Sequence, residues 1–311
     1  GPKTVLGGIW MATRTSECFG YLGPNGAGKT TTLKVLTGQL SPTSGTATIG
    51  GLSIQPYDTR IHSLLGVCPQ HDVLWLKLTA REHLRYFARI KGVAAKEIEG
   101  AVEEMLQMLD LAPVADRHAE GYSGGNKRRL SLAMACIGHP RVVFLDEPTT
   151  GVDVGVRRKI WECIRRLKER ASVVLTTHSM EEADALCDRI AVMVNGRVQA
   201  IGTPQRLKNV YGAGYKILVK TEHPAGALAV QQQLAQQLHA RTVQLLGCHL
   251  EMDCDRQDAQ ATTAADAAGI LARIFHLLEE ARDPCGIIDY SVGQTTLSQV
   301  FVSFAEKQQI T

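Results

Sequence analysis

The amino-acid sequence predicts an α/β fold, in which a doubly wound parallel sheet is followed by a smaller α+β unit. Short apolar runs alternate with segments of helical periodicity as far as about residue 210, a pattern typical of parallel strands with crossover helices. One run, 141–148 (RVVFLDEP), is continuously apolar, as expected of a strand buried on both faces. From residue 211 onward the strands and helices follow a different order.

Composition and charge agree with two globular units. Hydrophobic residues make up 44% of the 311 residues, which is ample core material. Residues 1–210 hold 27 basic and 20 acidic side chains, whereas residues 211–311 hold 7 and 11, so the first unit favours an anionic partner. The eight cysteines show no CxxC spacing and no histidine at metal-ligand spacing. They predict buried thiols in a reducing compartment and exclude a zinc site.

The sequence has no apolar run near the roughly 18–20 residues that a membrane span needs, and no signal peptide. It opens with Gly1-Pro2 and not with methionine. We therefore expect a piece of a longer protein, in which any membrane relationship depends on other parts.

The elements of the first unit follow in order. A strand at 17–22, a glycine-rich loop and a helix from about Lys29 to Leu36 open it. The turn-rich segment 41–54 predicts small antiparallel strands, and a strand within 61–70 ends at Pro69-Gln70. A helix at 79–91, with Thr79 and Glu82 as a capping box, and a second helix at about 95–110 come next. The remaining elements are the strand at 141–148, a helix at 156–170, a strand at 172–177, a helix at 180–187 and a strand at 189–194.

The second unit shows a β-α-β-β-α-β order that resembles a small ferredoxin-like sandwich. A strand begins at YKILVKTE (215–222), and a last strand is CGIIDYSV (285–292). A closing helix is expected over 295–309.

The loop after the first strand matches the P-loop pattern, with a strand before it and a helix after it. Its glycines let backbone N–H groups surround phosphate oxygens, the lysine would neutralise the β- and γ-phosphates, and the Thr30 hydroxyl would ligate Mg²⁺. The residues assigned to phosphate binding are Gly23, Pro24, Asn25, Gly26, Ala27, Gly28, Lys29, Thr30 and Thr31.

Polar side chains end the neighbouring buried strands, where open α/β sheets place ligands. Asp146 suits Mg²⁺, and Glu147 suits an attacking water. Because adjacent strand residues point to opposite faces, the two carboxylates are expected to do different work. His178 follows the next strand and could bridge the γ-phosphate and the water. Gln70 could contact Mg²⁺ or the water, and Asp153 could fix a loop at an interface.

A second phosphate-binding device lies about a hundred residues after the first. Ser123-Gly124-Gly125 enters an apolar-periodic helix, so free N–H groups and the helix dipole favour an anion. The basic run Lys127-Arg128-Arg129 on this helix is interpreted as a solvated face, as are the basic runs at 157–159 and 165–166. No aromatic residues interleave them, so no nucleic acid is expected as a partner.

The order of these motifs over 1–210 resembles the ATP-binding cassette (ABC) family. The resemblance implies that two cassettes pair head to tail, so that Ser123 and Gly125 of one cover the γ-phosphate held by the P-loop of the other. The resemblance also implies that Gly124, Asn126 and Asp153 contact the nucleotide. It implies catalytic roles for Glu147, His178, Lys29 and Gln70, and Mg²⁺ ligation by Thr30, Gln70 and Asp146.

Finer features resemble subfamily A, the lipid-exporter branch. They are ECFG at 17–20, CPQHD at 68–72, YSGGNKRRLS at 122–131 and the tail QTTLSQVFVSFA at 294–305, which looks more like a second cassette than a first. Asn126 stands where the wider family has glutamine, Ser16 where glycine is usual, and Val154-Gly155 where a proline-containing turn is usual. The adenine-stacking aromatic would precede residue 1, and Trp10 is read as part of the first strand.

The resemblance implies an ATP-binding domain at 1–210, with a helical subdomain at about 72–138, and a C-terminal regulatory α+β domain at 211–311. It implies ATP and Mg²⁺ as cofactors and hydrolysis that powers lipid export. Transmembrane domains that handle the lipid would dock near Gln70 and the segment 72–110, at the cytosolic face of a membrane. Two alternatives stay open: a cassette of a multidrug-type exporter, and a soluble cassette ATPase that acts on ribosomes or DNA.

Overall fold

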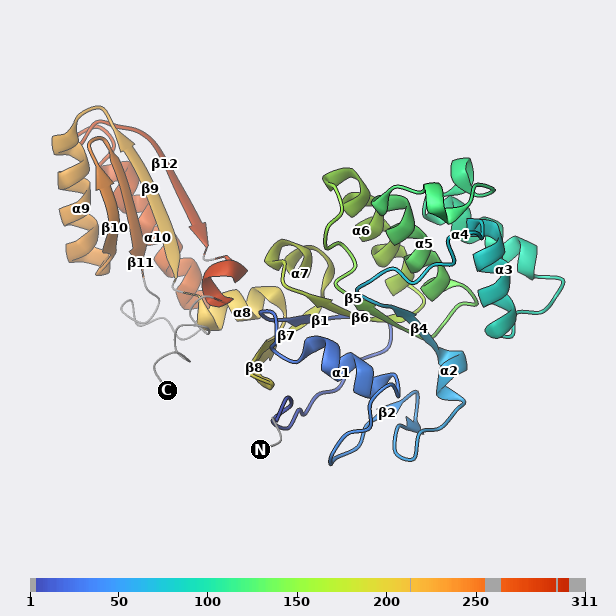
Figure 1. Ribbon diagram of the computed structural model, residues 1–311. Coiled ribbons are helices and arrows are strands. Elements are labelled where there is room, and N and C mark those ends of the chain that lie inside the picture. Colours follow the sequence, from blue (N-terminus) through green and yellow to red (C-terminus); the bar gives the residue numbers. More distant parts are fainter. Residues whose placement is uncertain (1–3, 213, 255–263, 295, 302–311) are drawn as a thin grey trace. The chain divides into compact units, whose positions relative to one another are not determined.

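The computed structural model describes residues 4–212, 214–254, 264–294 and 296–301 (Figure 1). The chain packs as two compact units, Gly1–Pro204 and Gln205–Thr311. In the described part of the chain, no helix combines the length and the apolar character that crossing a membrane requires.

The first unit is built on a six-stranded sheet in the order β4-β5-β6-β1-β7-β8. Every pairing is parallel except that of β7 with β8, which is an antiparallel hairpin. The predicted doubly wound α/β class is therefore confirmed. The strands are β1 (Cys18–Leu22), β4 (Leu65–Cys68), β5 (Val142–Asp146), β6 (Ser172–Thr177), β7 (Arg189–Val194) and β8 (Arg197–Gly202).

Helices cover both faces of this sheet. Figure 1 shows α1 (Lys29–Leu36) on one side and α5 (Gly124–Cys136), α6 (Val154–Lys168) and α7 (Met180–Leu186) on the other. Alternate strand residues such as Phe19, Tyr21 and Phe144 form a core with α1 and with the small hairpin of β2 (Thr48–Ile49) and β3 (Leu52–Ser53). The carboxyl ends of β1, β4, β5 and β6 therefore lie along one edge of a buried sheet.

Helices α3 (Ala80–Ile90) and α4 (Ile98–Met108) lie between β4 and β5 in the chain. The Thr79 hydroxyl accepts a hydrogen bond from the Glu82 N–H, and the Glu82 carboxylate accepts one from the Thr79 N–H, so the predicted capping box is confirmed. One turn of helix, α2 (Ile61–Leu64), occupies the first half of the predicted strand segment, and β4 takes only the second half.

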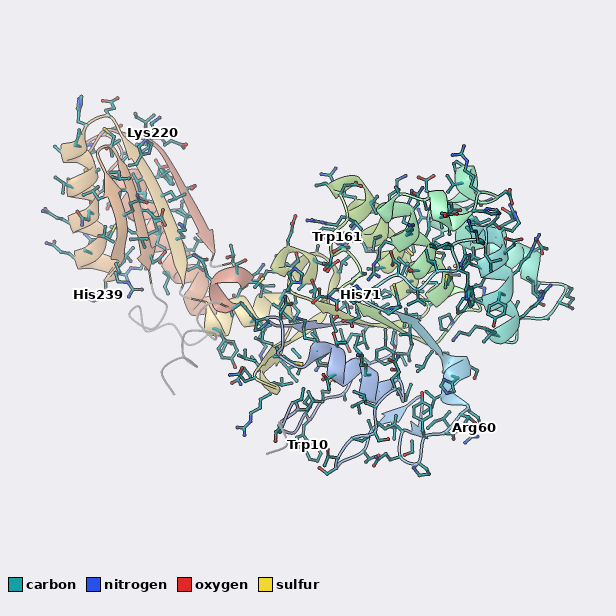
Figure 2. The ribbon with its side chains drawn as sticks, viewed as in Figure 1. Trp10, Arg60, His71, Trp161, Lys220 and His239 are labelled. Carbon is teal, nitrogen blue, oxygen red and sulfur yellow. The ribbon has the colours of Figure 1, made fainter. Side chains whose placement is uncertain are left out.

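The placement of Trp10 in the first strand is wrong. Strand β1 begins at Cys18, and Trp10 lies in an irregular segment with 92% of its surface exposed (Figure 2). The Gly7-Gly8 pair explains the difference, because Gly8 has a φ of +84° and so leaves the extended conformation of a strand.

The second unit is an antiparallel sheet in the order β10-β11-β9-β12, covered by two helices. Apolar residues of α9 and α10 pack on the same sheet residues, Ile217 and Met252 among them, so both helices lie on one face. This is the predicted ferredoxin-like order. The closing helix expected over 295–309 lies mostly outside the described residues. The elements are α8 (Pro204–Tyr211), β9 (Tyr215–Thr221), α9 (Pro224–Leu238), β10 (Arg241–Leu246), β11 (His249–Cys254), α10 (Ala264–Glu280) and β12 (Ile287–Gln294).

Buried His83 on α3 should make the first unit sensitive to acid. Its Nε2 accepts a hydrogen bond from the Trp75 N–H at 3.0 Å, and its Nδ1 lies 2.7 Å from the Thr79 carbonyl, an arrangement that suits the neutral ring. Burial lowers the pKa of His83, against an opposing hydrogen bond to Thr79. The unfolded state therefore binds the proton more readily, and the free energy of unfolding should fall as the pH drops below about 6.5.

We expect His83→Gln to lose less thermal stability between pH 7 and pH 5 than the unmodified chain. All three tryptophans lie in the first unit, so tryptophan fluorescence reports its unfolding alone. His118→Gln, at an exposed position, is the control. Equal pH dependence of the unmodified chain and the His83 variant would contradict this assignment.

Candidate nucleotide-binding site

The phosphate-binding loop joins β1 to α1. Gly26 and Gly28 have φ values of +81° and +104°, a region that side chains other than glycine rarely adopt. Gly28 is the N-cap of α1 and provides no side chain to bond the first N–H groups of the helix. These donors and the helix dipole give the loop the chemistry of an anion site.

Lys29 lies in the centre of this site with only 4% of its side chain exposed. Its Nζ donates hydrogen bonds to the carbonyls of Gly23 (2.7 Å) and Pro24 (3.2 Å) and lies 3.5 Å from Glu147 Oε1. Burial lowers the pKa of Lys29, and the neighbouring Glu147 carboxylate opposes that shift.

Asp146 ends β5 next to Thr30. The Thr30 hydroxyl lies 3.2 Å from Asp146 Oδ1, and Thr176 on β6 also donates to that oxygen. A hydroxyl and a carboxylate from the protein fit Mg²⁺, which takes oxygen ligands and completes its shell with water and phosphate oxygens. Among the described residues, no group of three or more His, Cys, Asp or Glu side chains could hold a metal ion.

The Glu147 carboxylate is the meeting point of the predicted catalytic residues. Its Oε2 lies 3.3 Å from Gln70 Nε2 and 3.3 Å from His178 Nδ1, and its Oε1 faces Lys29. The structure therefore brings Lys29, Gln70, Glu147 and His178 together. Thr150 also donates to Oε2, at 3.2 Å.

The expectation that Asp146 and Glu147 point to opposite faces of the sheet is wrong. Glu147 has a φ of +47°, so the chain leaves the extended conformation directly after Asp146. This turn directs the second carboxylate toward the P-loop, on the same side as the first. A strand residue that continued the pleat would have placed it on the other face.

The segment predicted as a second anion device lies at the start of α5. Ser123 caps α5 and accepts a hydrogen bond from the Asn126 N–H at 3.2 Å, while Gly124 and Gly125 form the first turn. Asp153 caps α6 in the same way, through the Val156 N–H at 2.9 Å. Over the described ranges, no hydrogen bond or ion pair links 123–126 to 23–31, so one chain does not bring the two devices together.

Gly125 is required by packing at this place. A Cβ there would lie 2.6 Å from Val156 Cγ2 on α6, whereas a Cβ on Gly124 would meet nothing within 4 Å. Valine has little χ1 freedom in a helix, so α5 and α6 would have to move apart. We expect Gly125→Ala to lower the free energy of unfolding by about 1–3 kcal/mol. Gly124→Ala should be neutral or stabilising by up to about 1 kcal/mol. Denaturant unfolding followed by tryptophan fluorescence measures both, and equal effects would contradict the packing argument.

Sequence reasoning missed two residues that hold the site together. Thr176 accepts a hydrogen bond from the Glu147 N–H at 3.0 Å while it donates to Asp146. Arg128 is not a solvated residue, because only 3% of its side chain is exposed. The position of Arg128 in the sequence could have indicated its burial, because it lies four residues before the apolar Leu132 and therefore on the same, buried face of α5.

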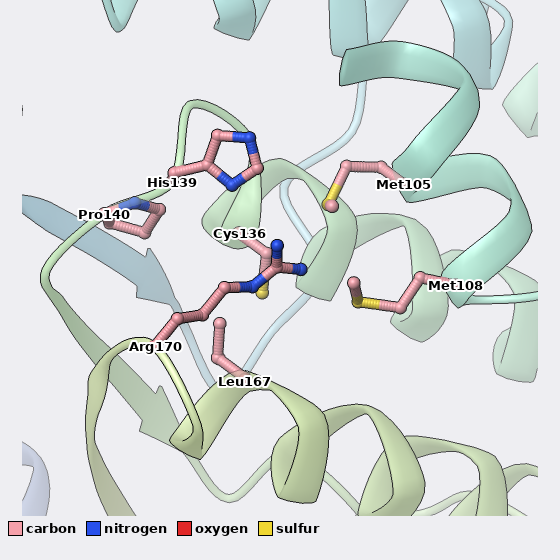
Figure 3. A pocket seen from close by; sticks show the side chains of 7 residues that line it. All are labelled: Met105, Met108, Cys136, His139, Pro140, Leu167 and Arg170. Carbon is pink, nitrogen blue, oxygen red and sulfur yellow. The ribbon is translucent and has the colours of Figure 1, made fainter. Parts of the chain in front are cut away.

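A separate small cavity lies away from these residues. It has a volume of about 100 Å³ and lies between α4, the end of α5 and α6 (Figure 3). Its lining residues are Met105, Met108, Cys136, His139, Pro140, Leu167 and Arg170, none of which belongs to the predicted site.

A P-loop lysine and threonine that face two carboxylates at the end of a parallel strand define a P-loop nucleotide-binding site. Residues 6–150 match the family described as "ABC transporter". The chain therefore carries the ATP-binding domain of an ABC transporter, and the resemblance drawn from the motifs is confirmed.

Similar proteins include members of subfamily A. The chain is 39% identical to ABC transporter A family member 5 of Arabidopsis thaliana over 99% of its own length and 32% of that protein. It is 46% identical to the retinal-specific phospholipid-transporting ATPase ABCA4 of Bos taurus, over 97% of its own length and 13% of that protein. The chain thus spans about a third of the plant relatives and about an eighth of the mammalian one.

Solved structures of ABC cassettes share the fold. One, described as an ATP-binding subunit of an ABC transporter, matches with a TM-score of 0.61 and 28% identity over 66% of this chain and 86% of its own. Another, the cassette MJ0796, described as a dimeric post-hydrolysis state bound to ADP and Pi, matches with a TM-score of 0.59 and 25% identity over 64% of this chain and 90% of its own.

Proposed function

We propose that the chain is the ATP-hydrolysing cassette of a subfamily A transporter, and that it powers lipid export across a membrane. The observation that carries the proposal is the environment of Glu147, a buried carboxylate in contact with the P-loop lysine, Gln70 and His178. A carboxylate positioned beside a phosphate-binding loop is suited to accept a proton from water that attacks the γ-phosphate.

The other residues support this step. Lys29 neutralises the β- and γ-phosphates, and the backbone N–H groups of 23–31 bind their oxygens. Thr30 and Asp146 would hold Mg²⁺, with Gln70 as a further neutral ligand, and the ion would supply positive charge to the phosphate oxygens. His178, half exposed, has its Nδ1 3.3 Å from Glu147 Oε2 and would bridge the γ-phosphate and the water. The Gln70 amide orients the water.

A second cassette completes the site in this proposal. Ser123, Gly124, Gly125 and Asn126 at the start of α5, with Asp153 at the start of α6, would contact the nucleotide on the P-loop of the partner. The dimeric state in which MJ0796 was solved supports this pairing. The single chain supports the pairing as well, because no hydrogen bond or ion pair among the described residues links the N–H groups at the start of α5 to the P-loop of the same chain.

The lipid substrate follows from the relatives. The similar bovine protein is named as a phospholipid-transporting ATPase, and a longer protein would supply the transmembrane domains near Gln70 and 72–110. The chain would then lie at the cytosolic face of a membrane. In this proposal residues 1–210 form the ATP-binding domain, with the helical subdomain at about 72–138, and 211–311 form a regulatory domain.

Light scattering during size exclusion tests the pairing. Glu147→Gln should bind ATP but hydrolyse it slowly, so its molar mass should double in Mg-ATP and return to that of the monomer without nucleotide. A monomer that binds ATP and never pairs would overturn head-to-tail pairing of identical cassettes. Salt-dependent binding to RNA or DNA would instead support the soluble alternative.

A further inference from the structure

Arg128 bonds to the two segments that carry Glu147 and Gln70. Its Nε donates to the Pro148 carbonyl at 2.8 Å, and its Nη2 donates to the carbonyls of Asp146 (2.9 Å) and Glu147 (3.0 Å). Three consecutive carbonyls around the catalytic carboxylate are thus bound by one side chain. A planar guanidinium with five donors can make this pattern, and a lysine ammonium cannot.

The remaining nitrogen reaches the loop that carries Gln70. Arg128 Nη1 donates to the carbonyls of Pro69 (2.6 Å) and Gln70 (3.3 Å) and to Asp72 Oδ1 (3.1 Å). Asp72 is the one carboxylate partner among these six acceptors, so the buried cation is stabilised mainly by carbonyl dipoles. Neighbouring Arg129 makes no such contacts, because its carbonyl partners are Leu109 and Asp110 in the helical segment.

The backbone of Glu147 needs such support. A glutamate with a φ of +47° costs of the order of 1–3 kcal/mol, and a conformation of this kind persists only where the surroundings hold it. Thr176 fixes the N–H of Glu147, and Arg128 fixes its carbonyl and those of both neighbours. Gln70, whose amide lies 3.3 Å from Glu147, is held by the same guanidinium.

We propose that Arg128 is a positioning residue for ATP hydrolysis: it holds Glu147 and Gln70 in their mutual arrangement from the helix that begins at Ser123. Arg128 does not touch the nucleotide in this proposal and acts through Glu147. The inference rests on the proposed function. It adds that the helix with the partner-facing anion device also sets the geometry of the chain's own catalytic carboxylate.

The test compares steady-state hydrolysis by the unmodified chain, Arg128→Lys, Glu147→Gln and the double variant. We expect Arg128→Lys to lower kcat by about 10–100-fold, the range found when groups that orient a reactive residue are removed. KM for ATP should stay near the unmodified value, because the P-loop is intact. The double variant should hydrolyse ATP no more slowly than Glu147→Gln alone, because Arg128 has no carboxylate left to position.

Arg81→Gln is the control for general loss of stability. Arg81 is largely buried and pairs with Glu103 and Asp116 in the helical segment, away from Glu147. It should lower the unfolding midpoint without lowering kcat. Arg128→Gln, which removes the buried charge, replaces the lysine variant if that variant does not fold.

Unchanged kcat in a folded Arg128 variant would overturn the inference. A double variant whose loss of kcat equals the product of the losses in Arg128→Lys and Glu147→Gln would also overturn it. An unmodified chain that releases phosphate no faster than Glu147→Gln would overturn the proposed function, and the inference with it. The unmodified rate therefore separates the two failures.

Discussion

Replacement of Glu147 by glutamine is expected to lower the rate of ATP hydrolysis by about 10²–10⁴-fold, the usual contribution of a positioned general base. Glutamine keeps the size of the side chain and can still accept the hydrogen bond from Gln70, but it cannot take a proton from water. The affinity for ATP should not fall, because the amide also removes a negative charge 3.5 Å from Lys29 and close to the γ-phosphate.

Phosphate release in single-turnover conditions measures this effect, and a nucleotide titration measures the affinity. Glu162→Gln is the matched control, since Glu162 is exposed and pairs with Arg166 four residues later on α6. A Glu147→Gln chain that hydrolyses ATP at a rate similar to this control would show that another group activates the water.

Lys29→Ala should weaken ATP binding by about 10–100-fold. A hydrogen bond to a charged group contributes about 1.5–3 kcal/mol, and the burial of Lys29 reduces screening of its charge by water. The substitution also leaves Glu147, with 6% of its side chain exposed, without its cation. The midpoint of thermal unfolding without nucleotide should therefore fall as well.

Lys34→Ala on the same helix provides the comparison, because Lys34 is exposed in the last turn of α1. It should leave both the affinity and the unfolding midpoint close to those of the unmodified chain. If Lys29→Ala and Lys34→Ala bound ATP with equal affinity, Lys29 would have no role in binding the phosphates.

The elements that the sequence predicted best are those with strong local signals. The helix from Lys29 to Leu36 and the strand at 172–177 have the predicted bounds, because a glycine-rich loop and a continuous apolar run mark them. The capping box at Thr79 and Glu82 is equally local. Such features depend on neighbours in the chain, which the sequence displays.

The parts that sequence reasoning missed depend on distant neighbours. Arg128 is buried because five carbonyls from two other segments surround it, and nothing in its own helix shows those carbonyls. The turn at Glu147 requires a positive φ that a glutamate disfavours, so strand periodicity gave the wrong face. Trp10 was assigned to a strand, but Gly8, with a φ of +84°, leaves the extended conformation two residues earlier.

The hydroxyl of Thr176 has a consequence for the spacing of the two carboxylates. The Thr176 hydroxyl oxygen accepts a hydrogen bond from the Glu147 N–H and donates one to Asp146, so the backbone of Glu147 and the carboxylate of Asp146 are tied to a single hydroxyl on β6. If β5 and β6 shift when nucleotide enters, the two carboxylates must shift by the same amount. The spacing between the two carboxylates would then be preserved while the strands around them move.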